Sequence, residues 1–527
     1  MKILVSDKLA QEGIDILKAT SGFTVDCKYG LTPEELKKTI KGYDALIIRS
    51  GTQVTADILE AADKLRVIGR AGVGLDNVDL KAATKRGIVA MNTPVGNTTS
   101  TAEHTMSLIL SLARRIPQAC ASLKSGKWER SKFDGVELYG KTLGIIGLGR
   151  IGSTVGRMAK SFGMKVIAYD PYLSAEVAAK MGVETRELND LLKEADFITI
   201  HIPKSSDTKY LISDKEFGLM KKTVRIVNCA RGGIIDETAL AKALKEGKIA
   251  GCALDVFEHE PPAADLPLFK FDNCVVTPHL GASTSEAQVN VAIEIAEAVR
   301  NALLGRGIVN AANFPSVGAE EYKILEPYID LAERMGKFAG QLIKGGIKEI
   351  RVTYSGVVTK QKVTPVTMGL VYGLLSHIMG ETVNMINAVD LARERGINVQ
   401  EIQSSKEEEF VNLVNVEIVA SQETFTVWGT LSGNHQPRIV RINSVYVEAI
   451  PTGYMLFINN NDKPGIVGAI GTMLAEAQIN IAGITLGRES QGGLAVSVVN
   501  VDREVPEQTL KKIRETKNIL FAKLIKV

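Results

Sequence analysis

The stretch Leu143–Gly152, LGIIGLGRIG, carries three glycines directly after a run of apolar residues. Gly147, Gly149 and Gly152 have the spacing G-x-G-x-x-G, which alone is weak because the chain contains 48 glycines. KTLGII before them is typical of a buried strand, and apolar residues at helical spacing follow as far as Phe162. This strand–loop–helix pattern predicts a tight turn, a close backbone approach to a pyrophosphate and close packing of helix on strand.

The next apolar stretch, KVIAYD, is a second predicted strand and ends on Asp170. A carboxylate at this position can accept hydrogen bonds from both ribose hydroxyls of a dinucleotide. It would repel a 2′-phosphate, so the sequence favours NAD over NADP as cofactor. The alternative is a glycine turn with a purely structural role.

Composition is that of an ordinary globular protein. The chain has 527 residues, 45% hydrophobic and 23% charged, and its length predicts about three or four domains. Lys plus Arg number 63 and Asp plus Glu 60, and no basic run stands out, so nucleic acid is not an expected partner.

The five cysteines are scattered and form no C-x-x-C pair, which favours reduced thiols. The chain begins MKILVSD, already a predicted strand, and has no secretory or transit pattern and no membrane-spanning apolar run. We expect a cytoplasmic protein that does not bind membranes.

The N-terminal half alternates predicted strands and helices and so predicts an α/β fold with two doubly wound parallel-sheet lobes of the Rossmann or flavodoxin type. We expect a first lobe at 1–95, completed by 284–314, and a nucleotide-binding lobe at 96–283. STAEHTMSLILSLARRI and SEAQVNVAIEIAEAVRNAL are predicted as long helices that link the lobes. A cleft between two such lobes is a natural place for a cofactor and a small substrate.

The C-terminal half has a different pattern. FPSVGAEEYKILEP is interpreted as a boundary, followed at 315–450 by an α+β domain without a recognisable chemical motif. Residues 451–527 show the order strand, helix, strand, strand, helix, strand, which predicts a ferredoxin-like βαββαβ fold.

Polar residues that follow the strands of the second lobe are the catalytic candidates, because ligands of open parallel sheets bind at the carboxyl ends of strands. Arg231 follows VRIVNCA, Glu260 follows AGCALDV after a few residues, and His279 follows CVVTP. A histidine can remove a hydroxyl proton, a carboxylate can orient it, and an arginine can hold a substrate carboxylate. These side chains fit oxidation of a hydroxyl by NAD, and no metal is needed.

Each candidate has an alternative. His259 could be mistaken for the base, but His279 has the stiffer mount and is favoured. Arg231 could cap a strand or pair with Asp236, and Glu260 could be a solvated loop charge. Asp255 could face the nicotinamide or cap a neighbouring turn, and the two are equally favoured.

Taken together, these segments resemble the D-isomer-specific 2-hydroxyacid dehydrogenases. The resemblance covers about residues 1–314 and rests on GRAGVGLDNVD, NTPVGNTTSTAEH, GIIGLGRIG, NCARGGIIDE, ALDVFEHEPP and PHLGAST. Within the family the chain is most similar to the long-form branch that oxidises D-3-phosphoglycerate with NAD. That branch carries an intervening domain and a C-terminal amino-acid-binding regulatory domain called ACT.

The resemblance implies roles for individual residues. It makes Arg231 the substrate anchor, Glu260 the orienting acid and His279 the proton donor and acceptor. It places Arg49, Ser50, Arg70 and Asn92 near the substrate. Its implied NAD contacts are Gly147, Gly149, Arg150, Ile151, Gly152, Asp170, Cys229, Ala230, Arg231, Asp255, His279, Leu280, Gly281 and Ala282. Val73 and Ile202 depart from the pattern, since relatives often have Thr there.

Two further sets of residues are candidates. Arg130 and Lys132, in WERSKF, could hold the phosphate of the substrate by reaching across a dimer interface; ordinary solvated charges are the alternative. Asn460, Asp462 and Asn480 match positions that hold L-serine in relatives, and a fold-stabilising module with cap residues is the alternative there.

The predicted function is oxidation of D-3-phosphoglycerate to 3-phosphohydroxypyruvate, the entry step to L-serine. We expect feedback regulation by L-serine and a homodimer or homotetramer. One rival is another D-2-hydroxyacid dehydrogenase, such as a glyoxylate or hydroxypyruvate reductase. A rival of another class is a non-enzymatic NAD-sensing corepressor.

Overall fold

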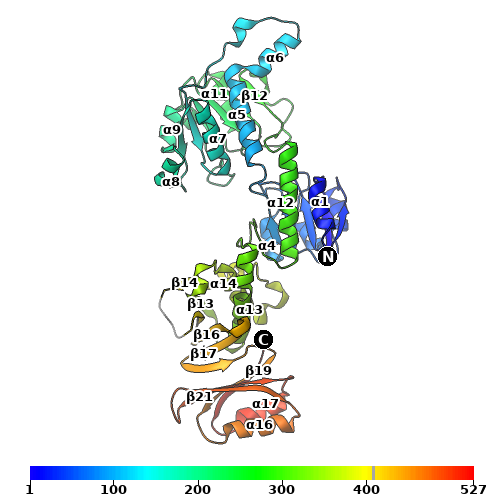
Figure 1. The fold of residues 1–527 in the computed structure, drawn as a ribbon, viewed down its shortest axis with the longest axis vertical. Helices are drawn as coiled ribbons and strands as arrows, with labels where there is room; N and C mark the ends of the chain where they lie inside the picture. The colour runs from blue at the N-terminus through cyan, green and yellow to red at the C-terminus, as the bar shows by residue number, and fades with distance from the viewer. Residues whose placement is uncertain (406–409) are drawn as a thin grey trace.

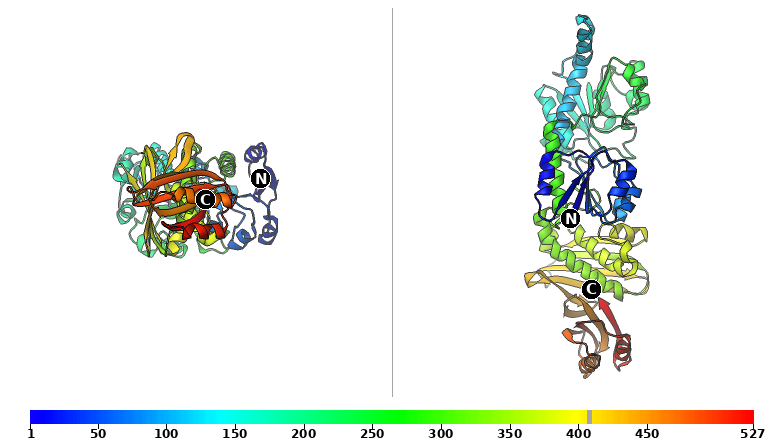
Figure 2. Two further views of the ribbon diagram at one scale, coloured as in Figure 1. Left: turned by 90° about the horizontal axis from the view of Figure 1, so that it is seen from below. Right: turned by 90° about the vertical axis from the view of Figure 1, so that its right-hand side faces the viewer.

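The computed structural model describes residues 1–405 and 410–527. The molecule is elongated, and its four β-sheets follow one another along the long axis (Figure 1). The sheet with the glycine loop lies at one end, the N-terminal sheet comes next, and the C-terminal sheet lies at the other end (Figure 2). In the part that the structure describes, no helix is long and apolar enough to cross a membrane.

The N-terminal lobe is a five-stranded parallel sheet in the order β2-β1-β3-β4-β5. Its central strand β3 has the sequence ALII and is buried throughout, as expected for a strand covered by helices on both faces. The elements are β1 Lys2–Val5, α1 Gln11–Lys18, β2 Thr24–Cys27, α2 Pro33–Thr39, β3 Ala45–Ile48, α3 Ala56–Ala61, β4 Val67–Arg70, α4 Leu80–Lys85 and β5 Val89–Met91.

The second lobe is a seven-stranded parallel sheet in the order β12-β11-β10-β9-β6-β7-β8. The order reverses at β6, the strand that leads into the glycine loop, and such switch points are where open parallel sheets bind ligands. The elements are β6 Thr142–Ile146, α7 Arg150–Ser161, β7 Lys165–Tyr169, α8 Ala175–Lys180, β8 Glu184–Thr185, α9 Leu188–Glu194, β9 Phe197–Ile200, α10 Asp214–Phe217, β10 Arg225–Asn228, α11 Glu237–Lys245, β11 Gly251–Leu254, the 3-10 turn Pro267–Lys270 and β12 Cys274–Val276.

Two long helices join the lobes, α5 Thr98–Arg114 and α12 Ser285–Leu303. Helix α12 returns the chain to the first lobe and packs so closely on α1 that a Cβ added to Gly13 would lie 2.5 Å from the Ala292 carbonyl oxygen. The first linking helix has the predicted length but begins and ends two residues earlier than the sequence predicts. Arg115 adopts a left-handed conformation with φ of 53°, and a separate helix, α6 Ile116–Lys124, begins there with Pro117 in its first turn.

Helix α6 and the 3-10 turn Arg130–Phe133 project beyond the second lobe at the end of the molecule (Figure 1). All nine residues of α6 are described and none is buried.

The third sheet is six-stranded and mixed, in the order β14-β13-β15-β16-β17-β18, with only β13 and β14 parallel. It confirms the α+β class of this region, but the sequence missed its longest helix, α13. The elements are α13 Ala319–Leu342, β13 Ile347–Gly356, the 3-10 turn Val357–Lys360, α14 Thr364–Met379, the 3-10 turn Gly380–Thr382, α15 Ala388–Glu394, β14 Asn398–Ser404, β15 Asn412–Ala420, β16 Thr424–Ser432, the 3-10 turn Gly433–His435, β17 Gln436–Ile442 and β18 Val445–Ala449.

Helix α13 begins inside the segment that the sequence suggested as a boundary, and it contains Pro327. Its C-terminal part is buried against α14, and glycines make this approach possible. A Cβ on Gly340 would lie 2.5 Å from the Leu374 carbonyl oxygen, and one on Gly336 would collide with the Leu370 carbonyl oxygen. The helix is held by this packing, which sequence pattern does not reveal.

The C-terminal sheet is antiparallel, in the order β20-β21-β19-β22, with both helices on one face. The predicted βαββαβ order is confirmed. The elements are β19 Tyr454–Asn461, α16 Ile466–Glu476, β20 Ile481–Arg488, β21 Leu494–Val501, α17 Glu507–Glu515 and β22 Ile519–Lys526.

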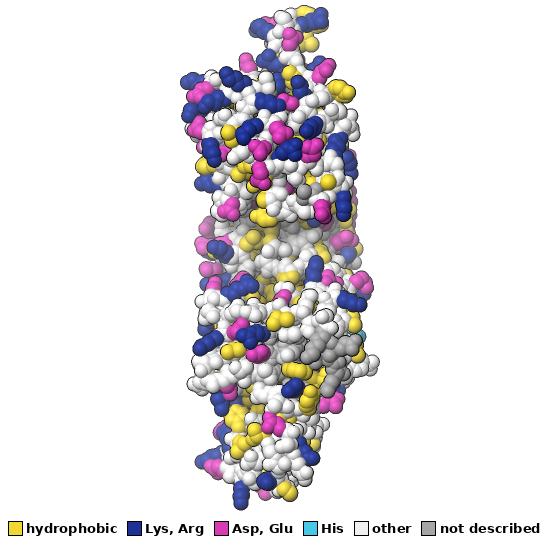
Figure 3. Space-filling view, turned by 90° about the vertical axis from the view of Figure 1, so that its left-hand side faces the viewer, with side chains coloured by type: hydrophobic (Ala, Val, Ile, Leu, Met, Phe, Trp, Pro, Cys, Tyr) yellow, Lys and Arg dark blue, Asp and Glu magenta, His cyan; other side chains and the backbone are white. Residues whose placement is uncertain are grey.

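Charge is evenly distributed on the face of the molecule that Figure 3 shows. Basic and acidic side chains are interspersed from one end to the other, without a patch of one sign. This distribution gives no electrostatic footprint for a nucleic acid on that face.

Candidate active site

The glycine loop has the geometry of a pyrophosphate cradle. Gly147 has φ of 94°, and a Cβ there would lie 2.6 Å from the His201 carbonyl oxygen. A Cβ on Gly152 would collide with the Gly147 carbonyl oxygen, so helix α7 packs tightly on the loop. Gly149 faces open space, with no atom within 4 Å of an added Cβ. The loop thus leaves room for a ligand exactly where α7 presents its free N–H groups, which suits a dinucleotide pyrophosphate.

Asp170 lies at the end of β7 beside this loop. Its Oδ2 accepts a hydrogen bond from the Leu148 N–H at 2.9 Å, and its Oδ1 accepts one from the Tyr172 N–H at 3.0 Å. Both bonds fix the carboxylate next to the loop, where the ribose of a dinucleotide would follow its pyrophosphate.

A cleft of about 730 Å³ lies between the two parallel-sheet lobes. It unites candidates from both, because strand ends of the first lobe face strand ends of the second. From the first lobe come Arg49, Ser50 and Arg70, and from the second come Arg231, Glu260 and His279. Ala282 and Val73 also line it.

His279 and Glu260 form a directed pair. The Nδ1 of His279 lies 2.7 Å from Oε2 of Glu260, and the Phe257 N–H donates to Oε1 at 3.1 Å. Partial burial raises the pKa of Glu260, but the bonds from His279 and Phe257 outweigh it, so the pKa lies below its usual value. Glu260 is therefore a carboxylate at neutral pH, and it turns the other imidazole nitrogen, Nε2, toward any reacting hydroxyl.

The backbone conformation at His279 depends on hydrogen bonds to Asp255. His279 has φ of 55°, and its N–H donates to the Asp255 carbonyl oxygen at 2.9 Å. The Asp255 carboxylate is completely buried and accepts from the N–H groups of Leu280 at 2.7 Å and Gly281 at 2.9 Å. This is the turn-capping alternative for Asp255. A contact between its side chain and NAD stays a prediction.

Two further donors complete the Asp255 site. Thr277 Oγ1 donates to Oδ1 at 2.6 Å, and Nε2 of His104 lies 3.1 Å from the same oxygen. Burial raises the pKa of Asp255. The hydrogen bonds from His104, Thr277 and Leu280 lower it by more than burial raises it, so the pKa lies below its usual value. The loop that carries His279, Leu280, Gly281 and Ala282 is thus anchored on a buried charge.

His259 lies outside the cleft lining and is exposed. Its neighbour in sequence, Glu260, points its carboxylate to His279 instead. The geometry therefore agrees with the preference for His279 as base.

Arg49 and Arg70 bring two positive charges to the cleft. The Nε atoms of both are buried and have no hydrogen-bond partner among the described residues, whereas Nη1 of Arg49 donates to the Lys8 carbonyl oxygen at 3.3 Å and Nη1 of Arg70 donates to the Gly74 carbonyl oxygen. Burial lowers the pKa of both guanidinium groups, that of Arg70 to about 10, where the charge of nearby Arg231 contributes. A buried donor without a partner is costly, so these partly satisfied cations suit an anion.

Arg231 reaches across the cleft. Its Nε donates to Asp76 Oδ2 of the first lobe at 3.2 Å, and its Nη1 donates to the Ala230 carbonyl oxygen at 2.7 Å. Its alternative partner, Asp236, instead caps the N-terminus of α11.

The remaining NAD candidates surround the loop. Cys229 is buried, and burial raises the pKa of its thiol to about 12, so it is a neutral apolar neighbour. Arg150 and Ile151 open α7. Ile202 packs against the Gly147 turn in place of a hydroxyl-bearing side chain.

Several predicted residues are not brought to the cleft. Asn92 is absent from its lining, and its amide donates to the Val73 carbonyl oxygen. Arg130 and Lys132 are exposed on the projecting 3-10 turn, and Lys132 Nζ contacts Glu129 Oε1 at 2.6 Å. Neither residue is part of the described lining of the cleft, so one chain does not bring them to it.

The effector candidates lie in the C-terminal module. Asp462 precedes α16 and accepts from Arg488 Nη1 at 2.9 Å and from the Gly492 N–H at 3.0 Å. Asn460 is 2% exposed, and its amide donates to the Asn461 carbonyl oxygen. Asn480 follows α16 and donates to Asp502 Oδ2 at 2.8 Å. The length of α16 separates Asn480 from Asp462, so one chain does not assemble the three.

Three cleft residues had no role in the sequence-based prediction. Asn97 lines the cleft, and its buried Oδ1 has no partner among the described residues. Lys204 follows β9 and adds a cation, and Asp76 contributes a carboxylate. Position after a strand could have identified Lys204, whereas the pairing of Asp76 with Arg231 spans 155 residues of sequence.

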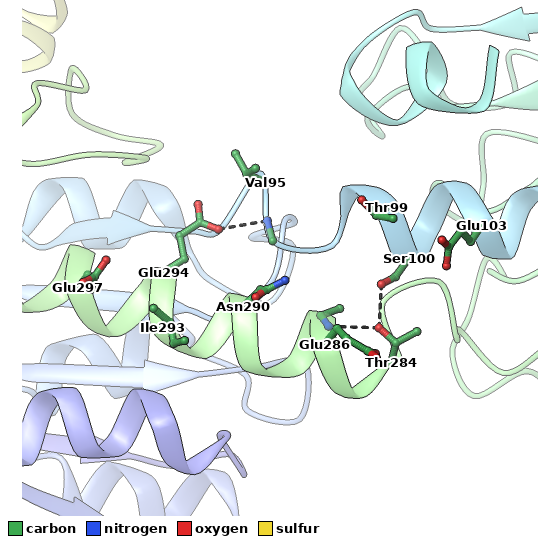
Figure 4. A pocket seen from close by; sticks show the side chains of 12 residues that line it. Val95, Thr99, Ser100, Glu103, Thr284, Glu286, Asn290, Ile293, Glu294 and Glu297 are labelled. Carbon is green, nitrogen blue, oxygen red and sulfur yellow. Dashed lines mark hydrogen bonds between the residues drawn. The ribbon is translucent and has the colours of Figure 1, made fainter. Parts of the chain in front are cut away.

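A second cavity of about 800 Å³ lies beside the helices that join the lobes (Figure 4). It is lined by four glutamates, Glu103, Glu286, Glu294 and Glu297. Glu294 accepts from the Gly96 N–H at 3.1 Å, and its burial raises its pKa. Carboxylates would repel an anion, so this cavity does not suit the anionic ligand that the arginine-lined cleft favours.

Three family profiles match successive parts of the chain. The NAD-binding domain of the D-isomer specific 2-hydroxyacid dehydrogenases matches residues 106–281. The D-3-phosphoglycerate dehydrogenase intervening domain matches residues 324–443, and the ACT domain matches residues 454–518.

Several D-3-phosphoglycerate dehydrogenases are similar to this chain over its full length. The D-3-phosphoglycerate dehydrogenase of Methanocaldococcus jannaschii is 46% identical over 520 residues, 98% of either chain. That of Archaeoglobus fulgidus is 42% identical over 529 residues, and that of Bacillus subtilis is 41% identical over 524 residues. These two matches cover 100% and 99% of both chains, respectively.

Solved structures match over about three fifths of the chain. The D-lactate dehydrogenase of Aquifex aeolicus, complexed with NAD and lactic acid, has a TM-score of 0.53 and 29% identity and covers 60% of this chain and 100% of its own. The apo-structure of the Escherichia coli D-lactate dehydrogenase has a TM-score of 0.53 and 31% identity and covers 59% of this chain and 100% of its own.

The first prediction concerns the cofactor. Asp170→Ala should narrow the preference for NAD over NADP, because the repulsion of a 2′-phosphate is removed and ~1.4 kcal/mol is worth tenfold in affinity. The measurement is kcat/KM with each cofactor. Asp190→Ala, which removes an exposed carboxylate of the same lobe, is the control and should leave the ratio unchanged. Equal efficiency of the unaltered protein with NADP would contradict the assignment.

The second prediction concerns the base. His279→Ala should lower kcat by roughly 10²–10⁴ while NAD still binds, as expected for the loss of a general base. His259→Ala is the matched control and should have a mild effect. Glu260→Gln should be intermediate and move the acidic limb of the rate profile to lower pH, because the imidazolium loses its counter-charge. A reversed order of the two histidine variants would show the base to be misplaced.

Proposed function

Because this chain belongs to the D-3-phosphoglycerate dehydrogenases, a branch of the D-isomer-specific 2-hydroxyacid dehydrogenases, we propose that the cleft between its parallel-sheet lobes is its active site. The chain is an NAD-dependent enzyme that oxidises D-3-phosphoglycerate to 3-phosphohydroxypyruvate, the entry step to L-serine. One observation carries the site assignment: two arginines with unpartnered, buried Nε atoms and the His279–Glu260 pair meet in a single cleft.

The proton is handled by the His279–Glu260 pair. Nδ1 of His279 donates to the Glu260 carboxylate, so Nε2 carries the lone pair that removes the proton of the substrate hydroxyl. The resulting imidazolium is stabilised by the negative charge of Glu260. Bound NAD would accept the hydride that leaves the carbon atom bearing this hydroxyl. In the reverse direction, His279 returns the proton to the carbonyl oxygen.

Arg231 is assigned to the substrate carboxylate, because a planar guanidinium can hold it bidentately next to the reacting carbon. Arg49 and Arg70 face the same anion from the first lobe. Ser50, which lines the cleft, stays a proposed neighbour of the substrate. Asn92 would act indirectly, because its amide donates to the carbonyl oxygen of Val73, which lines the cleft.

We propose that the chain acts as a homodimer or homotetramer. Support comes from α6 and the segment that follows it, because both expose large apolar side chains to solvent in a single chain. Ile116 is 51%, Leu123 57% and Trp128 78% exposed. A second copy that covers this arm would bring Arg130 and Lys132 toward a neighbouring cleft.

The four-domain division at 1–95 with 284–314, 96–283, 315–450 and 451–527 is likewise our proposal, supported by the four separate sheets. A cytoplasmic setting is supported by the five cysteines, which are all free thiols.

L-serine is the effector that we propose for the ACT module. The support is the placement of polar groups at both ends of α16, so that Asp462 of one module could meet Asn480 of another across a seam. The Gly492 N–H and Arg488 hold the pKa of Asp462 below its usual value, which keeps it anionic for an ammonium group. The module contributes no described residue to the cleft lining, so serine would act by favouring one arrangement of the oligomer.

The third prediction tests the substrate. Reduction of NAD, followed by NADH absorbance, should be far faster with D-3-phosphoglycerate than with D-glycerate. Replacing Arg130 and Lys132 together by Ala should raise KM for the phosphorylated acid much more than for the unphosphorylated one, because two phosphate-binding cations are lost. Lys127→Ala, on the same exposed segment, is the control. An equal rise for both acids would remove this pair from the phosphate site.

The fourth prediction tests regulation. L-serine should slow turnover by roughly 5–150-fold, the range that a coupling of ~1–3 kcal/mol permits. Asp462→Ala should abolish the response and leave uninhibited kcat nearly intact, since the module carries no chemistry. Asp502→Ala serves as a comparison, because it alters only the partner of Asn480. Calorimetry that detects no serine binding at millimolar concentration would end the proposal.

A further inference from the structure

Asp76 is a carboxylate in a cleft that must accept an anion. Three carboxylate side chains line the cleft, those of Asp76, Glu258 and Glu260. Two of them are engaged within the second lobe: Glu260 binds His279, and Glu258 accepts from the Tyr210 hydroxyl at 3.0 Å and the Glu237 N–H at 3.1 Å. Asp76 alone among these three comes from the first lobe, on the loop after β4.

The contact of Asp76 is with the substrate anchor. Its Oδ2 accepts from Arg231 Nε at 3.2 Å, and across residues 1–405 and 410–527 the structure gives its side chain no other hydrogen bond or ion pair. The Asp76 side chain is 61% exposed, whereas that of Arg231 is 27% exposed. An exposed carboxylate with one partner can leave that partner at little cost.

The donors of Arg231 are partly occupied. A guanidinium offers two edges for a bidentate grip, Nε with Nη2 and Nη1 with Nη2. Asp76 takes Nε, and the Ala230 carbonyl oxygen takes Nη1. Each edge therefore has one donor engaged, so a substrate carboxylate can be held on the Nε–Nη2 edge only after Asp76 has left.

The backbone near Arg231 makes room for this exchange. A Cβ on Gly74 would collide with Arg231 Nη2 and lie 2.5 Å from Asp76 Oδ2. The absence of a side chain at Gly74 lets the guanidinium and the carboxylate meet at the mouth of the cleft.

We propose that Asp76 is an internal counter-ion that occupies Arg231 in the substrate-free enzyme and is displaced by the carboxylate of the substrate. It neutralises Arg231 when no substrate is bound, next to Arg70, whose positive charge repels that of Arg231. It also competes with every carboxylate that seeks the same edge, so it sets the affinity of the cleft for carboxylates as a class. This rests on the proposed function of Arg231 as substrate anchor.

The test is the binding of malonate, a dicarboxylate without a hydroxyl to oxidise, to the full chain by calorimetry. Asp76→Asn should bind malonate roughly two- to five-fold more tightly and lower KM for D-3-phosphoglycerate by a similar factor, the size of an exposed ion pair. Asp76→Glu keeps the charge and should stay near the unaltered protein. Asp57→Asn, which removes a carboxylate of the same lobe outside the cleft lining, should change neither value.

The outcomes separate the two ideas. Unchanged or weaker malonate binding by Asp76→Asn would overturn the counter-ion role and indicate a brace between the lobes. Tighter binding of malonate without any oxidation of D-3-phosphoglycerate would leave the counter-ion in place and overturn the proposed function. Tighter binding that persists in an Arg231→Gln background, where the ion pair no longer exists, would show that Asp76 acts on another group than Arg231, and would also overturn the proposal.

Discussion

The buried carboxylate of Asp255 is the interaction on which the active cleft depends. A carboxylate without contact to solvent is stable only if donors surround it, and here Thr277, His104 and two backbone N–H groups do so. Those N–H groups belong to the residues directly after His279. The charge therefore fixes the left-handed turn that aims His279 at Glu260, so the position of the proposed base depends on a residue that need not touch the substrate.

The lobes divide the chemistry between them. Arg49, Arg70 and Asp76 belong to the first lobe, whereas Arg231, Glu260 and His279 belong to the second. Both residues of the proposed proton-transfer pair, His279 and Glu260, thus come from the second lobe, whereas binding of the anion requires residues of both lobes. The acidic cavity beside the joining helices has the opposite charge, so an anionic substrate is drawn to the arginine cleft and repelled from the larger hollow.

Sequence reasoning predicted what short-range rules govern. Strand ends, the glycine loop and the βαββαβ order follow from local patterns, and they place Arg231, Glu260 and His279 in one cleft. Features set by distant contacts escaped it. Helix α13 was missed because it contains Pro327 and is stabilised by glycine-mediated packing on α14. The break at Arg115 was missed because the helical pattern continues across a residue that adopts a left-handed conformation. The Arg231–Asp76 pair joins segments whose proximity only the folded lobes create.

The C-terminal module and the two lobes that form the cleft are separated along the molecule (Figure 1). Within one chain, the proposed effector can therefore influence the cleft only through the domain between them. The C-terminal sheet packs on α13, where the rings of Phe457 and Phe338 lie 5.8 Å apart and Gln341 donates to the Lys526 carbonyl oxygen. Helix α13 in turn follows the segment in which Ile308 and Val317 exchange backbone hydrogen bonds at the base of the first lobe. Asn387 binds the Lys85 carbonyl oxygen at the end of α4, the helix that follows the Asp76 loop. The C-terminal module is therefore connected through these contacts to the lobe that carries Arg49, Arg70 and Asp76. A shift transmitted along this route changes the grip on the anion before it changes proton transfer, so regulation through it would act mainly on substrate affinity.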